Sequence, residues 1–446
     1  MPQNTLMRIS NISITSLFGM YSYDLNIQAK DTDDEEKIVI FYGDNGSGKS
    51  TLLKLAFHMI APDRGEGHKT FVLNTEFKKL SVKFNDGTVV LAERANNQTN
   101  GEYELSVKRG RKKAVKAIVN SNRSDEHDDL HKLIEPALQE LDCALYLLSD
   151  DRAIHRAGSD FQNNRSESIR KKRHYADELS IREMELRVLR NNSPESPDDM
   201  AKQLLKSAIN MTEDWFRRRV IGSSTQGDSD VNELYAKILK QISDRGGDKA
   251  TEIGKKVAEK RINNLIIESK KFSRYGLLPE FDGNNILEII TNIDQSTFNV
   301  IIDVLSPYLN SMETKNEAMK DIYERIDTFV TVSGKFYTNK TLNYHLEKGI
   351  QIKSSNGKIL EPEMLSSGER HLLLLFCTSI VTGGSPSILM IDEPEISLNI
   401  KWQRMLVDAL IQCIGDNDIQ FIFSTHSLEI LAKHKSRVVK LENKMG

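Results

Sequence analysis

The sequence predicts an α/β fold: a largely parallel sheet with an antiparallel β subdomain, split by a mostly helical insert. Three observations support this prediction. The apolar run Lys37–Tyr42 leads into a glycine-rich turn and then a helical pattern, the order of a parallel strand–turn–helix unit. Apolar runs alternate with helical patterns again after about residue 386. Between about 160 and 330 the pattern is mostly helical.

Composition excludes several protein classes. The chain has 446 residues, 61 Lys and Arg against 64 Asp and Glu, and a formal charge of −3. This near balance excludes a histone-type polyanion binder and an acidic disordered chain. Three widely separated cysteines, Cys143, Cys377 and Cys413, argue against a disulfide framework and a zinc knuckle. Because no signal-peptide pattern or bilayer-length apolar run is seen, we expect a cytoplasmic protein without a membrane partner.

The N-terminal part predicts strands around one helix. Residues 9–28 partly alternate apolar and polar side chains, which indicates strands. Residues 79–119 predict antiparallel hairpins, with a turn at Asn85–Gly87. A helix is expected over Lys49–Ile60, and Cys143–Leu148 predicts a buried strand.

The middle region predicts several helices of moderate length. One is expected after Ser229 and Asp230, because apolar residues then recur at helical spacing up to Ile242. Breakers argue against one long coiled-coil arm. They are Pro194, Pro197, Gly222, Gly227, Gly246, Gly247 and Pro279.

The last part predicts alternating strands and helices. Short buried strands separated by helices imply a parallel sheet covered on both faces. The expected elements are strands Ile350–Ile352 and Lys358–Leu360, helix Glu369–Ile380, strand Ser387–Ile391, helix Leu398–Cys413 and strand Ile419–Ser424.

Gly43–Ser50 matches the phosphate-loop pattern GxxxxGK[ST], in its required place between a strand and a helix. Glycines let backbone N–H groups point at phosphates, and the helix N-terminus adds a positive potential. Lys49 is expected to bridge the β- and γ-phosphates of ATP, and Ser50 to bind Mg²⁺. The alternative is a chance glycine-rich turn. The nucleotide-binding candidates are Gly43, Asn45, Gly46, Ser47, Gly48, Lys49, Ser50 and Thr51.

Three further motifs follow in the sequence. The apolar strand before Pro394 ends in Asp392, placed to hold Mg²⁺, and Glu393, placed to deprotonate an attacking water. Acidic strand ends are common on surfaces, so this pattern gains its meaning beside the phosphate loop. Leu365–Glu369 (LSSGE) opens a helix and is either a second anion site or only an N-cap. His426 follows the last long strand.

In this order the motifs resemble the ABC-type ATPase domain: Walker A, signature, Walker B and switch histidine. The LSSGE form is familiar in the branch with RecF-, SMC- and OLD-like ATPases. The resemblance implies Glu393 and His426 as catalytic residues and ATP with Mg²⁺ as cofactors. It also implies a homodimer with ATP sandwiched between two heads, and we expect a higher oligomer. The signature residues that would meet the partner's ATP are Ser366, Ser367, Gly368 and Glu369.

Two features of that family lack a clear counterpart. Ser149–Arg152 lies in a suitable place for the Q-loop, with a salt-bridged loop as the alternative. Phe18, Tyr21 and Tyr23 are candidates for the aromatic residue that stacks on adenine, with core packing as the alternative.

The interval between Lys49 and Leu365 exceeds what a compact nucleotide-binding domain needs, which predicts an inserted domain. We expect 1–155 to form the N-terminal lobe of the head, 156–330 the helical insert and 331–446 the C-terminal lobe. A transporter head would lack such an insert. The chain after His426 leaves no room for the TOPRIM nuclease of OLD proteins, so we expect any nuclease on a separate chain.

Size, insert and missing nuclease most resemble the AriA-type ATPase of PARIS anti-phage defence, with the Septu-type ATPase as competitor. This resemblance implies an oligomeric sensor that holds a separate effector, a suspected TOPRIM nuclease. A phage-encoded trigger, such as an acidic DNA mimic, would release that effector. Two alternatives stay open: a RecF-like DNA-binding ATPase of repair or recombination, and a scaffold that barely turns ATP over.

Three basic clusters could contact DNA or an acidic protein: Lys108–Lys113, Arg170–Arg173 and Arg217–Arg219. The near-neutral net charge hides these local concentrations. For any single cluster, a solvated helix face or loop is the favoured interpretation.

Overall fold

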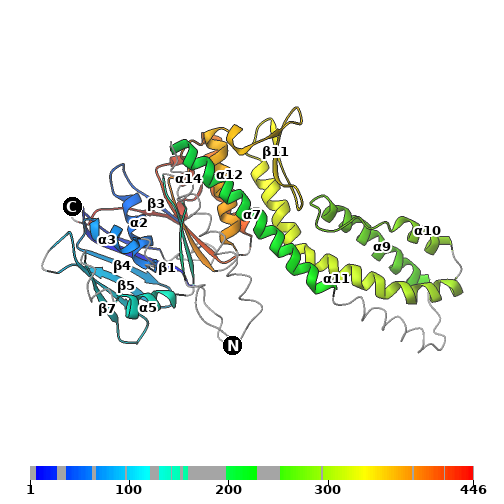
Figure 1. Cartoon of the computed structure of the whole chain (residues 1–446), viewed down its shortest axis with the longest axis horizontal. Helices are drawn as coiled ribbons and strands as arrows, with labels where there is room; N and C mark the ends of the chain where they lie inside the picture. Colours follow the sequence, from blue (N-terminus) through cyan, green and yellow to red (C-terminus); the bar gives the residue numbers. More distant parts are fainter. Residues whose placement is uncertain are drawn as a thin grey trace. The chain divides into compact units, whose positions relative to one another are not determined.

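The computed structural model describes residues 7–27, 37–62, 67–95, 98–120, 130–141, 143–150, 154–158, 197–228, 252–292, 295–383, 386–415 and 417–444 (Figure 1). The chain divides into two compact units, Met1–Ala208 with Leu365–Gly446, and Ile209–Met364. The second unit overlaps the predicted insert, 156–330, but begins and ends later in the chain. The helix expected after Ser229 and the cluster Arg170–Arg173 lie outside the described residues.

The first unit contains an antiparallel sheet, which confirms the predicted hairpins. Its strand order is β2-β1-β4-β5-β6-β7. The turn predicted at Asn85–Gly87 joins β4 to β5, with Gly87 at φ 83°. The strands are β1 (Ile9–Leu17), β2 (Tyr21–Asn26), β4 (Lys79–Phe84), β5 (Val89–Glu93), β6 (Tyr103–Lys108) and β7 (Val115–Val119).

A second sheet of the same unit is mostly parallel, as predicted. Its order is β15-β3-β14-β13-β8-β9, and only β9 runs antiparallel to its neighbour. The carboxyl ends of β3, β13 and β14 meet at one edge, because Tyr42 pairs with Thr425 and Asp392 with Ser424. The strands are β3 (Ile38–Tyr42), β8 (Ala144–Leu148), β9 (Ile154–Gly158), β13 (Ser387–Asp392), β14 (Ile419–Thr425) and β15 (Val438–Lys440).

Helices α2, α12 and α13 of this unit lie where the apolar pattern predicted helices, whereas α3, α5 and α14 were not predicted. Helix α2 starts at the phosphate loop and buries Leu52, Leu53, Leu55, Ala56 and Phe57, so it is apolar on nearly every side. The helices are α2 (Lys49–Ile60), α3 (His68–Asn74), the π-helical turn Leu130–Ile134, α5 (Glu135–Gln139), α12 (Ser367–Thr382), α13 (Ile400–Ile414), α14 (Leu428–Lys433) and the 3-10 turn Lys435–Arg437.

Two buried polar side chains tie separate parts of this unit together. Gln420 of β14 accepts a hydrogen bond from the Ile9 N–H (2.8 Å) and donates one to the Ile9 carbonyl (2.9 Å), which joins the two sheets. Arg94, only 3% exposed, donates to the carbonyls of Val72, Leu73, Phe77, Thr99 and Gly101. Its guanidinium also lies 4.1 Å from the Phe77 ring centre. Arg94 therefore fixes three chain segments at once.

The second unit contains longer helices than the sequence predicted. Helix α11 has 40 residues and α7 has 32, so the expectation of helices of moderate length was wrong. Gly222 and Gly227 lie inside α7, and Pro307 lies inside α11. A glycine in a helix costs only about 1 kcal/mol, which packing can offset. The elements are α7 (Pro197–Asp228, shared between the units), α9 (Glu252–Ser273), α10 (Asn284–Asn292), α11 (Gln295–Gly334), β10 (Lys340–His345), β11 (Gly349–Ser354), β12 (Ile359–Leu360) and the 3-10 turn Pro362–Met364.

The three cysteines are buried, and no disulfide joins them. Within the described ranges, no helix combines the length and apolar character needed to cross a bilayer.

Candidate functional site

The phosphate loop occupies the turn between β3 and α2. Gly46 and Gly48 have φ values of 79° and 80°, a left-handed conformation that glycine adopts without strain. A Cβ on Gly48 would come within 2.8 Å of Leu17 Cδ2, so the site also lacks space for a side chain. No side chain caps α2, and its first turn contains no acidic residue. Its N-terminal amides can therefore bind an anion.

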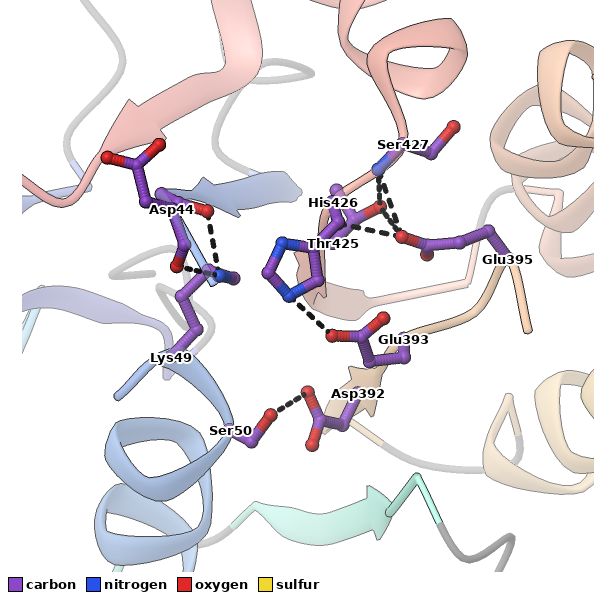
Figure 2. A network of polar contacts seen from close by, with 10 residues as sticks. Asp44, Lys49, Ser50, Asp392, Glu393, Glu395, Thr425, His426 and Ser427 are labelled. Carbon is purple, nitrogen blue, oxygen red and sulfur yellow. Dashed lines mark hydrogen bonds and ion pairs between the residues drawn. The ribbon is translucent and has the colours of Figure 1, made fainter. Parts of the chain in front are cut away.

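Lys49 is 3% exposed and folds back over the loop. Its ammonium donates hydrogen bonds to the carbonyls of Gly43 (2.7 Å) and Asp44 (2.9 Å), as Figure 2 shows. Burial lowers its pKa, and the nearby carboxylates of Glu393 and Asp392 oppose that shift. The cation is thus held at the loop that is expected to receive phosphates.

Ser50 and Asp392 meet although they are far apart in sequence. The Ser50 hydroxyl donates to Asp392 Oδ1 at 3.0 Å (Figure 2). Asp392 ends β13, is 1% exposed, and its Oδ2 has no hydrogen-bond partner within the part of the chain that the structure describes. Burial raises the pKa of this carboxyl group. A hydroxyl beside an unsatisfied carboxylate oxygen fits the oxygen ligands that Mg²⁺ prefers.

Glu393 and His426 form the second pair. His426 Nε2 lies 2.8 Å from Glu393 Oε1 (Figure 2). Burial, together with the charges of Glu395 and Asp392, raises the pKa of Glu393 to about 7. Burial and Lys49 lower the pKa of His426. Glu393 also has a φ of 51°, a strained value for a residue with a side chain. A carboxylate with a pKa near neutrality suits a general base.

The sequence analysis did not single out Glu395, which joins the two loops of the site. Its Oε1 accepts hydrogen bonds from Thr425 Oγ1 (2.6 Å), the His426 N–H (2.7 Å) and the Ser427 N–H (3.0 Å). A second acidic residue two positions after Glu393 was the available sequence signal. The signal was weak because the contact depends on the pairing of β13 with β14.

The signature residues begin α12 with a capping box. Glu369 N–H donates to Ser366 Oγ (3.3 Å), and the Ser366 N–H donates to Glu369 Oε2 (2.9 Å). The N-cap interpretation of this motif is therefore correct for these two side chains. Ser367 is exposed, whereas Gly368 is buried, and a Cβ there would lie 2.4 Å from the Ser397 carbonyl oxygen.

The aromatic candidates separate clearly. The Tyr23 hydroxyl donates to the Ser47 carbonyl at 2.8 Å, and Tyr23 is 3% exposed, so it packs beneath the phosphate loop. Tyr21 stacks on Tyr23. Phe18 is 37% exposed, and its ring edge lies 3.6 Å from the position of a Cβ on Gly48. Phe18 is therefore the candidate with an open ring beside the loop.

Other predicted polar segments are used in different ways. Asp150 pairs with Lys54 at 2.7 Å, which fits the salt-bridged alternative; Asp151 and Arg152 lie outside the described residues. In the cluster Arg217–Arg219, Arg217 pairs with Glu213 and Asp214, and Arg219 lies over the Trp215 ring.

The cluster Lys108–Lys113 lies at the tip between β6 and β7. Arg109 there pairs with Asp86 and Glu140. Lys108, Arg111, Lys112 and Lys113 are exposed. This tip is the described basic cluster whose charges face solvent.

Several curated relatives are ATP-binding proteins by name. The peptidoglycan transport ATP-binding protein YejF of Agrobacterium fabrum is 23% identical over 159 residues, which are 35% of this chain and 28% of that protein. A putative ABC transporter ATP-binding protein of Methanosarcina acetivorans is 32% identical over 78 residues, 18% of this chain and 27% of that one. The chain thus matches less than a third of the length of these relatives.

A solved structure and a family model also match. The Smc head domain of Pyrococcus furiosus, with an extended coiled coil and bound to the C-terminal domain of ScpA, aligns with 98% of this chain and 96% of its own. That alignment has 12% identity and a TM-score of 0.37. The family model described as "AAA domain, putative AbiEii toxin, Type IV TA system" matches residues 38–432. The match covers most of the chain and all four motifs, so this protein belongs to that family of AAA-type, ABC-like ATPase domains.

Proposed function

We propose that the chain binds and hydrolyses ATP. The observation that carries this proposal is the convergence of Lys49, Ser50, Asp392, Glu393 and His426 at one edge of the parallel sheet. The raised pKa of Glu393 supports its use as a base, because a carboxyl group with an ordinary pKa would hold a proton too weakly.

Each residue has a distinct role in this proposal. The loop amides and Lys49 bind the phosphates, Ser50 and Asp392 would hold Mg²⁺, and Phe18 offers a ring to adenine. When bound, Mg²⁺ would neutralise charge on the β- and γ-phosphates. Glu393 orients and deprotonates water, and His426 stays beside it to contact the γ-phosphate.

The signature residues act on a second copy of the chain in this proposal. Ser366, Ser367 and Gly368 would contact the γ-phosphate held by the partner head, which makes ATP part of a homodimer interface. Ser367 is exposed, which fits a contact made between molecules. Hydrolysis would then loosen the dimer.

The finer proposal is an anti-phage sensor and scaffold that controls a separate effector, with a TOPRIM nuclease suspected. The family description, which names a toxin of a toxin–antitoxin system, supports a conflict-related role. The AriA-type ATPase of PARIS is our preferred subfamily, and a phage protein such as an acidic DNA mimic would trigger release of the effector that it holds. The Septu-type ATPase is its competitor.

The direct test compares phosphate release by the wild type and Glu393→Gln. We expect at least a 100-fold lower rate for the variant with nucleotide binding retained, because only the base is lost. Equal rates would reject Glu393 as the base. For the defence role, cells carrying the gene with its neighbours should lose phage protection when Lys49 is replaced by Ala. If the wild-type gene with its neighbours gives no protection, that role is rejected.

One observation favours a second candidate, a RecF-like DNA-binding ATPase. The β6–β7 tip holds exposed Lys108, Arg111, Lys112 and Lys113, a charge pattern that suits DNA phosphates. Replacing Arg111, Lys112 and Lys113 together by Ser should lower duplex DNA affinity and flatten its salt dependence. The same changes at Lys79, Lys116 and Lys444, which pair with carboxylates, serve as the control. Absence of binding by the wild type at low salt would reject this candidate.

A further inference from the structure

We propose that Glu395 is a positioning residue: its carboxylate holds the turn Thr425–Ser427 so that the His426 ring stays beside Glu393. The proposal rests on the ATPase function proposed above. It assigns a task to a residue outside the four motifs.

One carboxylate oxygen gathers three hydrogen-bond donors. Glu395 Oε1 accepts the Thr425 hydroxyl at 2.6 Å and the backbone N–H groups of His426 and Ser427 at 2.7 and 3.0 Å (Figure 2). Hydrogen bonds to an ionised acceptor are roughly twice as strong as neutral ones. These contacts fix the main chain on both sides of the His426 side chain.

The same short loop carries Glu393, the partner of the His426 ring. Glu393 is held by its own N–H, which donates to the Ser424 carbonyl at 2.8 Å. Glu393 and Glu395 therefore lie on one loop and both contact the 424–427 segment. Glu393 contacts the His426 ring, and Glu395 contacts the backbone. The 2.8 Å distance between Glu393 Oε1 and His426 Nε2 depends on both attachments.

The second oxygen of Glu395 argues against a merely structural cap. Oε2 is buried without a hydrogen-bond partner among the residues that the structure describes. An unsatisfied buried polar atom costs about 1–3 kcal/mol. Glu395 therefore keeps its second oxygen at a cost in stability.

The experiment measures kcat and KM for ATP in Glu395→Ala, Glu395→Gln and His426→Ala. Glu395→Ala should lower kcat about 100-fold with KM changed less than threefold, because a misplacement of about 1 Å can cost that much. Glu395→Gln keeps an acceptor oxygen of the same reach, so it should restore most of the rate. Glu429→Gln is the matched control, since Glu429 lies in the first turn of α14 and pairs with Arg404.

A double variant separates positioning from other roles. If Glu395 acts through His426, Glu395→Ala with His426→Ala should be no slower than His426→Ala alone. The proposal would be overturned if the two substitutions had additive effects on the activation free energy. It would also be overturned if Glu395→Ala changed KM alone. Should Glu395→Ala fail to fold, Glu395→Asp, whose carboxylate reaches one methylene less far, takes its place. A rate for Glu395→Asp equal to that of Glu429→Gln would overturn the proposal.

A spectroscopic readout keeps this proposal distinct from the ATPase function. If the wild type releases no phosphate, the proposed function fails whatever Glu395 does. With histidine-selective ¹⁵N labelling, Glu395→Ala should still move the His426 ring resonances, and Glu429→Gln should leave them in place. Resonances that stay unchanged in both variants would overturn the positioning role.

Discussion

Lys49 is the residue on which nucleotide binding is expected to depend most. Its ammonium is buried and donates hydrogen bonds to two loop carbonyls. These bonds hold the charge at the loop that phosphates would enter. We predict that Lys49→Ala lowers ATP affinity at least 100-fold in a fluorescent-nucleotide titration. Lys79→Ala, at an exposed ion pair with Glu93, should stay within twofold of the wild type. Unchanged affinity in Lys49→Ala would refute the phosphate-loop assignment.

Arg94 shows how one side chain can stabilise several loops. Replacing it by Met keeps most of the packing but leaves five carbonyl groups without their donor. We expect Arg94→Met to lower the free energy of unfolding by about 3 kcal/mol or more, measured by urea denaturation. Arg111→Met, at the exposed β6–β7 tip, should change it by less than about 0.5 kcal/mol. A similar, small effect in both variants would contradict the role of Arg94.

Individual site residues differed in how well the sequence predicted them. The phosphate loop was recognisable because its glycines, Lys49 and Ser50 act within eight consecutive positions. Glu395 was missed because its three contacts exist only once β13 pairs with β14, some 30 positions away. The alternative interpretations of Phe18, Tyr21 and Tyr23 needed burial to separate them.

At the scale of elements, the signature helix α12 packs closely on the loop that follows β13. Gly368 faces the Ser397 carbonyl, and His371 lies 3.1 Å from the Pro394 carbonyl through its Nε2. A methyl group on Gly368 would push this backbone contact apart. We predict that Gly368→Ala lowers thermal stability by about 1–3 kcal/mol and slows phosphate release.

Gly334 provides the matched control for that substitution. It ends α11, and a Cβ there would meet no atom within 4 Å. Gly334→Ala should therefore leave stability and turnover within error of the wild type. Equal effects of the two substitutions would show that the Gly368 contact is unimportant.

A cluster of histidines at the far end of α2 makes the stability of the fold depend on pH. His58 Nδ1 lies 2.9 Å from His68 Nδ1, and burial, with His68, His155, Lys69 and Lys54 nearby, lowers the pKa of His58 to about 3. As the pH falls through 6.5, His58 therefore gains a proton in the unfolded chain but stays neutral in the folded chain. The stabilisation is complete above pH 6.5 and is lost as the pH falls toward 3.

We predict that this cluster makes the free energy of unfolding fall by about 1–2 kcal/mol as the pH is lowered from 6.5 to 5. His58→Gln keeps a hydrogen-bonding group at the site but cannot titrate, so its stability should fall less over that range. Chemical denaturation at the two pH values measures the difference. Parallel pH curves for the variant and the wild type would refute the assignment.

Elements were predictable where the pattern was strong and local. The runs before and after the phosphate loop gave β3 and α2 at their observed places. The length of α7 was underestimated, because the breakers Gly222 and Gly227 were outweighed by packing along the remaining turns, and α11 likewise continues through Pro307.

At the scale of the whole molecule, the proposed homodimer gives the clearest test. Glu393→Gln should trap ATP, so the 50.7 kDa monomer is expected to become a dimer in sedimentation experiments with ATP and Mg²⁺. Adding Ser367→Arg, at the exposed start of α12, should prevent that dimer while ATP binding persists. Thr70→Arg, on α3 beyond the far end of α2, is the control and should leave the dimer intact. A dimer that survives Ser367→Arg would contradict an interface through the signature.

The order of strands in the parallel sheet has a consequence for protein synthesis. Strand β3, which leads into the phosphate loop, is hydrogen-bonded on one side to β14 and on the other to β15. At 5–20 residues per second, a ribosome needs roughly 20–80 s after making β3 to reach those strands. Throughout that time the apolar segment Ile38–Tyr42 has neither neighbour, which exposes it to chaperones. Until then, Lys49 and Ser50 cannot meet Asp392, Glu393 and His426, which follow much later in the chain.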